Sequence, residues 1–193
     1  MKIDFGCGPF KRPGYTGIDT CAFPGVDIVY DGAAIPLPDN SVSEVYSSHC
    51  LEHVPDLAAT LAELWRVSKP GAIWTIEVPH FSSCTYWYSC DHRRPFGVQS
   101  FDLFDGLLSC EDFVFIRNNI DLRRERVRLF WWSRRSLVKK RGWKRILLNA
   151  VNRVLNSAAN AAPFFCDRIW CHLVGGFDCI EFRLRVVKAT CEA

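Results

Sequence analysis

Short apolar runs rich in β-branched residues recur through the first half of the chain, and each run ends at Gly, Asp or Pro. These candidate strands cover residues 2–5, 15–18, 27–30, 44–47 and 72–78. Between the last two runs, four large apolar side chains recur at helical spacing: Leu57, Leu61, Leu64 and Trp65. Asp56 is placed to cap this helix, and the Lys-Pro-Gly run at residues 69–71 is placed to end it. Strands alternating with helices predict an α/β, Rossmann-like, mostly parallel sheet with flanking helices.

The second half of the chain is less regular. Residues 113–118 read as a strand, residues 122–130 alternate apolar and charged side chains as an exposed strand would, and residues 179–187 alternate as a half-buried strand. Residues 136–156 place apolar side chains along one helical stripe, with most basic side chains elsewhere. At 193 residues the chain has the length of one ordinary domain. We therefore expect one domain over residues 1–193, with an added basic amphipathic helix at about residues 133–160.

The charge distribution is uneven. Residues 117–153 carry 13 of the 24 Lys and Arg residues and only two acids, so this segment is +11 while the remainder is −8. Such a segment attracts phosphates, anionic lipid headgroups or acidic substrates. Three interpretations of the basic helix stay open: a solvated face, a membrane-surface contact and a nucleic-acid contact. Four aromatic residues favour the membrane surface: Phe130, Trp131, Trp132 and Trp143.

Ten cysteines are scattered through the chain, mostly inside apolar segments, which favours reduced core thiols over a disulfide framework. Cys84, Cys90 and His92 form the nearest approach to a metal cluster, but their spacing matches no standard zinc module, so we expect no metal site. No stretch approaches the roughly 20 apolar residues that cross a bilayer, and no export signal is evident. We expect a cytoplasmic protein, peripheral at the inner membrane face if the basic helix binds lipid.

A glycine pair follows the first predicted strand in the run Asp4-Phe5-Gly6-Cys7-Gly8-Pro9. Such glycines let backbone N–H groups approach a ligand closely, and Asp19, at the end of the second strand, suits a ribose diol. The pair alone is weak evidence. A dinucleotide fingerprint would have Gly or Ala where this chain has Lys11, which disfavours NAD.

Four successive blocks over roughly residues 1–80 resemble class I S-adenosylmethionine-dependent methyltransferases. These blocks are DFGCGP, GIDT, VYDGAAIPLPDNSVSEVYSSHCLEHV and LAELWRVSKPGAIWTIEVP. The later segments SCDHRRPFGVQSFDLF and WCHLVGGFDCIEFRLRVVK more loosely resemble small bacterial type-11-like members, which are often associated with surface-polysaccharide genes. The resemblance implies a donor-binding half at residues 1–80 and an acceptor-side half at residues 81–193.

The same resemblance assigns roles to individual residues, and it implies S-adenosyl-L-methionine as the cofactor. Gly6 and Gly8, with Asp4 before them, would lie beside the methionine moiety of the donor, and Asp19 would hold its ribose hydroxyls. Asp31, Gly32 and Ala33 would border the adenine. Ser47, Ser48 and His49 would line the donor and face the transfer site. The structural alternatives are a tight turn at the glycines and a turn cap at Asp31.

One departure from the resemblance concerns the loop after the glycine pair. Residues 9–14 contain two prolines and leave no room for the helix that follows this loop in most relatives. The donor carboxylate would then depend on loop N–H groups and on Lys11 or Arg12.

Methyl transfer needs a base only when the acceptor is protonated. The candidates are His49, His80 and His92, whereas His53 reads as a structural histidine. Aromatic and charged residues in segment 82–104 could cover the acceptor, or form a small satellite core. We expect methyl transfer to an oxygen or nitrogen of a small molecule or glycan, with a lipid-linked glycan included. The alternatives are a non-catalytic donor-binding scaffold or sensor and an RNA methyltransferase, with nucleic acid the less favoured partner; the oligomeric state is left open.

Overall fold

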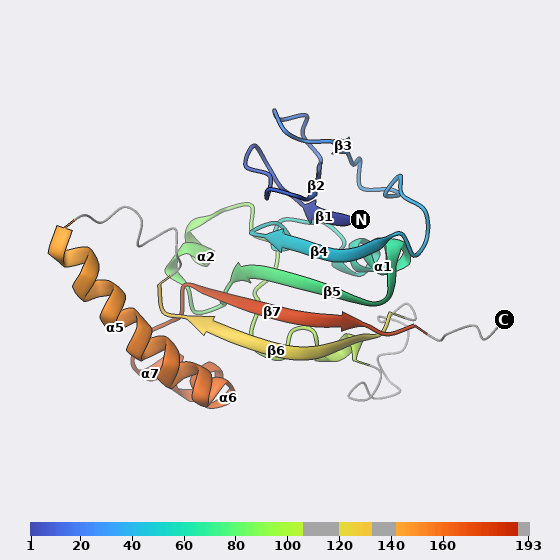
Figure 1. Cartoon of the computed structure of the whole chain (residues 1–193). Helices are drawn as coiled ribbons and strands as arrows, with labels where there is room; N and C mark the ends of the chain where they lie inside the picture. The colour runs from blue at the N-terminus through green and yellow to red at the C-terminus, as the bar shows by residue number, and fades with distance from the viewer. Residues whose placement is uncertain (106–119, 133–141, 189–193) are drawn as a thin grey trace.

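The computed structural model describes residues 1–105, 120–132 and 142–188. In this part of the chain, seven strands form one sheet in the order β3-β2-β1-β4-β5-β7-β6 (Figure 1). Their bounds are Lys2–Phe5 (β1), Thr16–Asp19 (β2), Ile28–Val29 (β3), Val42–Ser48 (β4), Ser68–Pro79 (β5), Leu122–Phe130 (β6) and Cys179–Val186 (β7). Pairs from β3 through β5 are parallel, and β7 is antiparallel to both of its neighbours. The predicted mostly parallel α/β sheet is confirmed.

Most strands lie where the apolar runs predict them, with shifts at their ends. β1 and β6 have the predicted bounds, and β2 begins and ends one residue later than predicted. β5 begins at Ser68, so the Lys-Pro-Gly run expected to end the helix lies inside the strand, and the helix ends before it. The strand expected at residues 113–118 lies outside the described residues.

Helix α1 (Leu57–Val67) connects β4 to β5 and is capped as predicted. The Asp56 side chain accepts a hydrogen bond from Ala59 N at 2.9 Å, which satisfies a free N–H of the first turn. The helix buries Leu61, Leu64 and Val67 against the sheet. Its apolar stripe therefore explains both its position and the face it covers.

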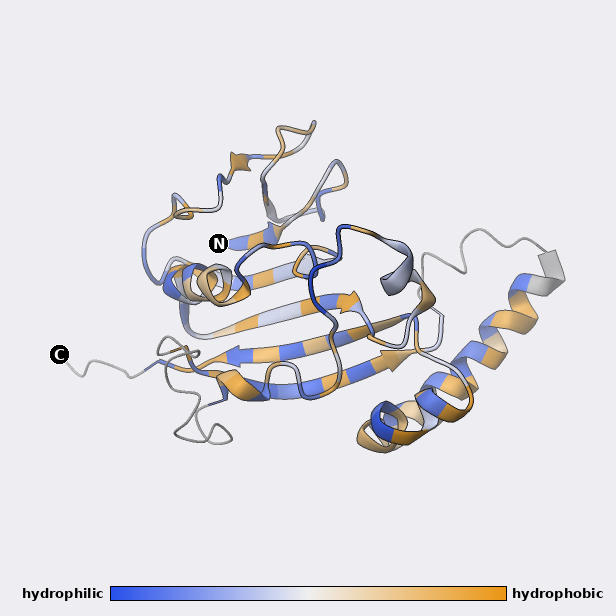
Figure 2. Cartoon of the chain, turned by 180° about the vertical axis from the view of Figure 1, so that it is seen from behind, coloured by the Kyte–Doolittle hydropathy of each residue, from blue (hydrophilic) through white to orange (hydrophobic). Residues whose placement is uncertain are grey.

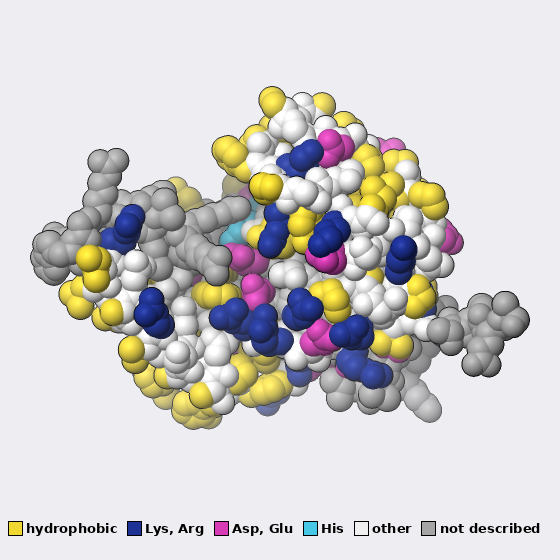
Figure 3. Space-filling view, viewed as in Figure 1, with side chains coloured by type: hydrophobic (Ala, Val, Ile, Leu, Met, Phe, Trp, Pro, Cys, Tyr) yellow, Lys and Arg dark blue, Asp and Glu magenta, His cyan; other side chains and the backbone are white. Residues whose placement is uncertain are grey.

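The two faces of the sheet differ in character. Along β4, β5 and β7 the side chains alternate between fully buried apolar residues and half-buried polar ones. The apolar face packs under α1 and the segment containing α2 (Cys84–Tyr88) and η1 (Asp102–Phe104), as Figure 2 shows. On the opposite face, Lys and Arg side chains are interspersed with acids (Figure 3). In the described part of the chain no helix covers that polar face, so the sheet has one solvated side.

The three connections between β1 and β4 contain no helix. Residues 9–14 link β1 to β2 without a helix, as the two prolines predict. Residues 20–27 and 30–41 link the next strands without helices as well. The described chain therefore supplies no crossover helix for the polar face of the sheet.

The basic amphipathic helix predicted at about residues 133–160 is present as α5 (Gly142–Ala161) and lies beside β6 (Figure 1), while residues 133–141 lie outside the described residues. Three asparagines one turn apart point toward the end of that strand. Asn160 accepts from Leu129 N and donates to Leu129 O, both at 2.9 Å. Asn156 accepts from Trp131 N at 2.8 Å, and Asn152 accepts from Trp132 N at 3.1 Å. This asparagine ladder satisfies backbone groups along the edge strand of the sheet. After α5, the chain continues through three short helical elements: α6 (Pro163–Phe165), η3 (Cys166–Trp170) and α7 (Cys171–Leu173).

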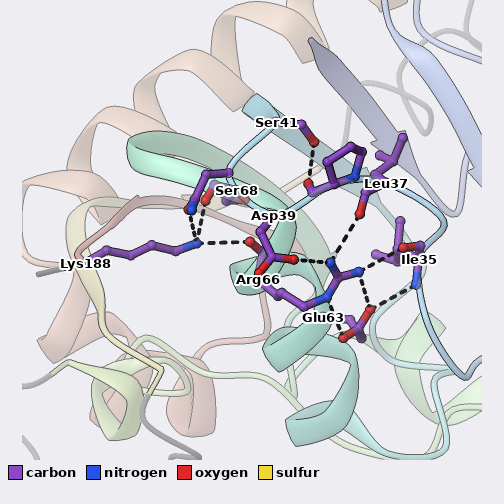
Figure 4. A network of polar contacts seen from close by, with 10 residues as sticks. Ile35, Leu37, Asp39, Ser41, Glu63, Arg66, Ser68 and Lys188 are labelled. Atoms are coloured by element: carbon purple, nitrogen blue, oxygen red, sulfur yellow. Dashed lines mark hydrogen bonds and ion pairs between the residues drawn. The ribbon is translucent and has the colours of Figure 1, made fainter. Parts of the chain in front are cut away.

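A polar network joins the connection before β4 to the end of α1 (Figure 4). The Arg66 guanidinium contacts the carboxylates of Asp39 and Glu63 and donates to the carbonyls of Ile35 and Leu37. Lys188, beyond β7, donates to the carbonyls of Arg66 and Ser68. The network connects the segment after β7 to residues 1–80, the predicted donor-binding half. It lies at the opposite end of the sheet from the glycine loop.

All eight cysteines in the described segments are free thiols, in agreement with the expectation of reduced cysteines. Among the described residues, no helix is long and apolar enough to span a membrane.

Candidate active site

The glycine loop begins where β1 ends. Gly6 has φ +70° and Gly8 has φ +54°, a left-handed conformation that costs other residues strain. A Cβ on Gly6 would lie 2.2 Å from the Cys50 Sγ, so Gly6 is also required by the close approach of the chain beyond β4. A Cβ on Gly8 would meet nothing within 4 Å. The loop is therefore packed on one side at Gly6 and open on the other at Gly8.

Asp19 holds the glycine loop in place. Its carboxylate accepts hydrogen bonds from Gly8 N at 2.8 Å and from Cys21 N at 3.0 Å. The loop is further fixed by Gly6 N, which donates to Ile18 O at 2.8 Å. Asp31 accepts from Ala33 N at 2.9 Å in a local turn. Asp31 thus caps a turn, which was its alternative interpretation, and Asp19 supports the tight turn at the glycines.

Two cavities meet at the glycine loop, and Gly6 lines both. The first, of about 430 Å³, contains five of the predicted site residues: Asp4, Gly6, Gly8, Ser48 and His49. The second, of about 330 Å³, contains four of them: Gly6, Asp19, Asp31 and Gly32. Ser47 and Ala33 line neither of these cavities, and Ser47 is buried. The carboxyl ends of β1, β2 and β4 therefore bring most of the predicted donor residues together, where open α/β sheets place ligands.

Sequence reasoning missed several lining residues. Tyr46 lines the first cavity from β4, and Tyr30, Cys50 and Val54 line the second. Tyr46 alternates with buried residues along β4, so the sequence predicts that it lies in a strand. Its proximity to the glycine loop depends on the pairing of β1 with β4, which the sequence alone does not give. Burial raises the pKa of the Cys50 thiol to about 12, so Cys50 acts as a neutral wall of the cavity.

The two cations expected to serve the donor carboxylate differ in their contacts. Lys11 Nζ forms an ion pair with Asp27 at 2.7 Å. The Arg12 guanidinium lies 4.3 Å from the centre of the Tyr46 ring, and Arg12 N donates to Asp4 at 2.7 Å. Burial raises the pKa of Asp4, against the effect of this hydrogen bond. Both cations line the first cavity, but the Lys11 charge is paired with Asp27, so Arg12 is the better placed of the two.

His49 is the predicted histidine that reaches a cavity. It has φ +54°, a strained conformation for a non-glycine residue, and turns the chain immediately after β4. Its Nδ1 lies 3.4 Å from Glu52 and its Nε2 lies 3.7 Å from Glu77. Burial lowers the pKa of His49, but the two carboxylates outweigh burial and raise it to about 9.

His80 and His92 lie away from the cavities lined by the glycine loop. His80 is fully buried, with Nδ1 2.6 Å from Ser82 Oγ and Nε2 3.0 Å from Asp167. His92 places Nδ1 2.9 Å from Tyr86 O, and its ring centre lies 4.8 Å from that of His53. The segment predicted to cover the acceptor also contains Trp87 and Tyr88, which are exposed.

Part of the chain, beginning after the glycine loop, matches known proteins. A family described as "Methyltransferase domain" matches residues 17–76, from β2 into β5. A probable S-adenosylmethionine-dependent methyltransferase of Mycolicibacterium smegmatis is 37% identical over 59 residues. The matched segment is 30% of this chain and 23% of that protein. Over this segment the chain is therefore similar to S-adenosylmethionine-dependent methyltransferases.

Solved structures extend the similarity of fold to nearly the whole chain. One is an S-adenosylmethionine-dependent methyltransferase from Archaeoglobus fulgidus. The match covers 95% of this chain and 85% of that protein, with TM-score 0.53 and 18% identity. One from Thermotoga maritima, described as a possible histamine N-methyltransferase, matches 97% and 82%, with TM-score 0.54 and 14% identity. A [4+2]-cyclase matches 97% of the chain and 75% of its own, with TM-score 0.51 and 15% identity. The fold is therefore shared by proteins with different described activities.

The cofactor of these methyltransferases is S-adenosylmethionine, and its site can be tested against the residues present. Gly8 leaves open space where a side chain would fill the first cavity. Tyr30 and Val54 supply apolar walls to the second cavity, and Asp31 supplies a carboxylate at its edge. A cavity of mixed polarity that adjoins a more apolar one at Gly6 suits a ligand with an amino-acid end and an adenine end. The residues present fit the cofactor.

Proposed function

We propose that this protein transfers a methyl group from S-adenosylmethionine to an oxygen or nitrogen of a small molecule or glycan acceptor, with a lipid-linked glycan included. The observation that carries the proposal is the position of Gly6 between the two cavities. The donor's adenosine would occupy the second cavity beside Asp19 and Asp31. Its methionine part would pass Gly6 and Gly8 into the first cavity.

The residues of the chain have few chemical tasks in such a transfer. The bound donor would supply a methyl group already activated on a sulfonium, so the protein must orient the acceptor and exclude water. Asp19 fixes the glycine loop through Gly8 N. Of the three histidines proposed from sequence, His49 lies at the cavity and would contact the acceptor, whereas His80 is held by Ser82 and Asp167.

A methyl-transfer screen tests the activity. The full chain is incubated with donor carrying a labelled methyl group and with pools of glycans, lipid-linked glycans, small amines and RNA. The proposal expects label in a glycan or small-molecule pool, and a His49→Gln variant with lowered transfer but retained binding of S-adenosylhomocysteine. Donor-product binding without transfer to any pool would favour the scaffold instead. One observation favours that alternative, because the connection between β1 and β2 contains no helix.

The helical segment 142–174 supports a second part of the proposal, a cytoplasmic location with a peripheral contact at the inner membrane face. Four apolar side chains of α5 point to solvent: Ile146, Leu147, Val151 and Val154. Exposed Arg145, Arg153 and Arg168 accompany them, and Asp167 is the one acid of the segment. The asparagine ladder occupies the inward side of the helix, so the apolar stripe is left for lipid.

Vesicle binding tests this contact. We expect co-sedimentation with vesicles containing phosphatidylserine, and weaker binding to phosphatidylcholine alone. The double substitution Leu147→Glu and Val154→Glu should abolish sedimentation, whereas Ser157→Glu on the same helix should lower it only slightly. Steeply salt-dependent binding to RNA, with no binding to vesicles, would favour the RNA methyltransferase instead. The arginines of β6 argue against RNA, since Arg126 and Arg128 lie 3.9 Å from Glu181.

A further inference from the structure

A cluster of three potential metal ligands lies just beyond β4. Glu52, His53 and His92 each offer one ligand atom, and these atoms all lie within 4.8 Å of one another. Glu52 and His53 come from the turn that follows His49, and His92 comes from the loop after α2. The hydrogen bond from Arg93 N to Glu52 O, at 2.8 Å, holds these two segments together.

Glu52 is the most unusual member of the cluster. Its side chain is fully buried, and neither carboxylate oxygen has a hydrogen-bond partner among the described residues. The nearest cationic groups are His49 Nδ1 at 3.4 Å and His53 Nε2 at 3.9 Å. Burial of a carboxylate without hydrogen bonds is costly unless a cation compensates its charge. His49 offsets part of this charge, but neither Glu52 oxygen accepts a hydrogen bond from it, so the carboxylate keeps oxygen atoms free to bind a cation in this cluster.

The two imidazoles are oriented as metal ligands usually are. His92 Nδ1 lies 2.9 Å from the carbonyl oxygen of Tyr86, which can only accept, so Nδ1 carries the proton and Nε2 keeps its lone pair. His53 directs Nε2 toward Glu52 at 3.9 Å, and its Nδ1 lies 3.0 Å from the Asp91 carboxylate without forming a hydrogen bond. A backbone carbonyl in the position of Tyr86 O fixes the tautomer of metal-binding histidines, as it does for His92.

We propose that Glu52, His53 and His92 bind one divalent first-row transition metal ion. Two imidazoles with one carboxylate suit Zn²⁺, Co²⁺ or Fe²⁺ better than Mg²⁺ or Ca²⁺, which prefer oxygen ligands alone. Three protein ligands leave at least one coordination position for water or another oxygen ligand. Sequence spacing predicts no such site, because His92 is separated from Glu52 by 40 positions and reaches it only through the folded loop.

Direct metal binding tests the proposal without any methyl-transfer assay. The full chain is stripped with chelator and titrated with ZnCl₂ by calorimetry and with CoCl₂ by visible absorption. The expected result is one equivalent per chain, d–d bands typical of nitrogen and oxygen ligation, and no competition by a hundredfold excess of MgCl₂. His92→Ala, His53→Ala and Glu52→Gln should each weaken Co²⁺ binding at least tenfold.

Matched controls separate this site from other metal-binding groups. His172→Ala changes an exposed histidine of α7, and Cys84→Ser with Cys90→Ser removes two exposed thiols. These controls should bind Co²⁺ as the parent chain does. Absence of stoichiometric binding to the parent chain, or binding lost only in the cysteine variant, would overturn the proposal. Circular dichroism and binding of S-adenosylhomocysteine verify that each variant is folded, so failure here is distinguishable from failure of the proposed methyl transfer.

Discussion

At the scale of single residues, left-handed positions at Gly6, Gly8 and His49 shape the site. The sequence motif predicts Gly6 as a point of close approach, but its actual neighbour, Cys50, comes from beyond β4. His49 adopts the same backbone region without being glycine, and no local sequence signal indicates this. The positions of Gly6 and Asp19 at the edge of the sheet could be predicted, because Gly6 directly follows β1 and Asp19 ends β2. The Glu52–His92 proximity could not, because it depends on how a distant loop folds back.

The clearest residue-scale prediction concerns Asp19. Asp19→Asn replaces one acceptor oxygen by an NH₂ group, which cannot accept from Gly8 N or Cys21 N. The loop loses one of its supports, and the donor loses a carboxylate for its ribose. We expect calorimetry to show at least tenfold weaker binding of S-adenosylhomocysteine, about 1.4 kcal/mol. The control Asp39→Asn lies in the Arg66 network, away from the loop, and should bind as the parent chain does. Equal affinities for both variants would show that Asp19 does not serve the donor.

At the scale of elements, the strength of the local pattern decides what could be predicted. α1 has an apolar stripe and a cap residue, and β1, β6 and β7 have clear alternation, so each lies within one residue of its predicted position at either end. The amphipathic pattern of α5 predicts a helix, but it does not reveal that asparagines face the protein. That arrangement requires the edge of β6 beside the helix, which is a contact between separate elements.

The asparagine ladder gives the element-scale prediction. Asn160→Ala removes the two hydrogen bonds to the backbone of Leu129. Leaving these backbone groups without their partner should lower the free energy of unfolding by about 1–3 kcal/mol. Urea denaturation followed by circular dichroism measures the loss. The matched control, Asn149→Ala, changes an exposed asparagine of the same helix and should change stability by less than about 0.5 kcal/mol. If Asn160→Ala leaves the free energy of unfolding unchanged, the ladder contributes nothing to holding α5 on the sheet.

At the scale of the whole molecule, long-range polar contacts join the C-terminal helical segment to the sheet. Asp167 of η3 accepts from Val98 N at 2.8 Å and lies 3.0 Å from His80, which follows β5. These contacts join residues that are 69 and 87 positions apart in the sequence. The polar face of the sheet carries no helix in the described part of the chain, and for the connection after β1 the two prolines predict this absence.

The Asp167 contact predicts how stability depends on pH. Burial raises the pKa of Asp167, but the bonds from His80 and Val98 outweigh it, and the pKa lies below the ordinary value of 3.8. A lowered pKa stabilises the folded chain above 3.8, and this stabilisation is lost as the pH falls through the folded-state pKa. Thermal melts from pH 6 to pH 3 should therefore show a smaller decrease of Tm in Asp167→Asn than in the parent chain. Parallel curves for the two proteins would assign the acid sensitivity to other groups.

The central claim is that the cavities on either side of Gly6 hold S-adenosylmethionine. Isothermal titration of the folded full chain with S-adenosylhomocysteine tests it most directly. The account predicts saturable binding of one molecule per chain, weakened at least tenfold by Asp19→Asn. Titration of demonstrably folded protein without heat of binding, for either the donor or its demethylated product, would contradict it.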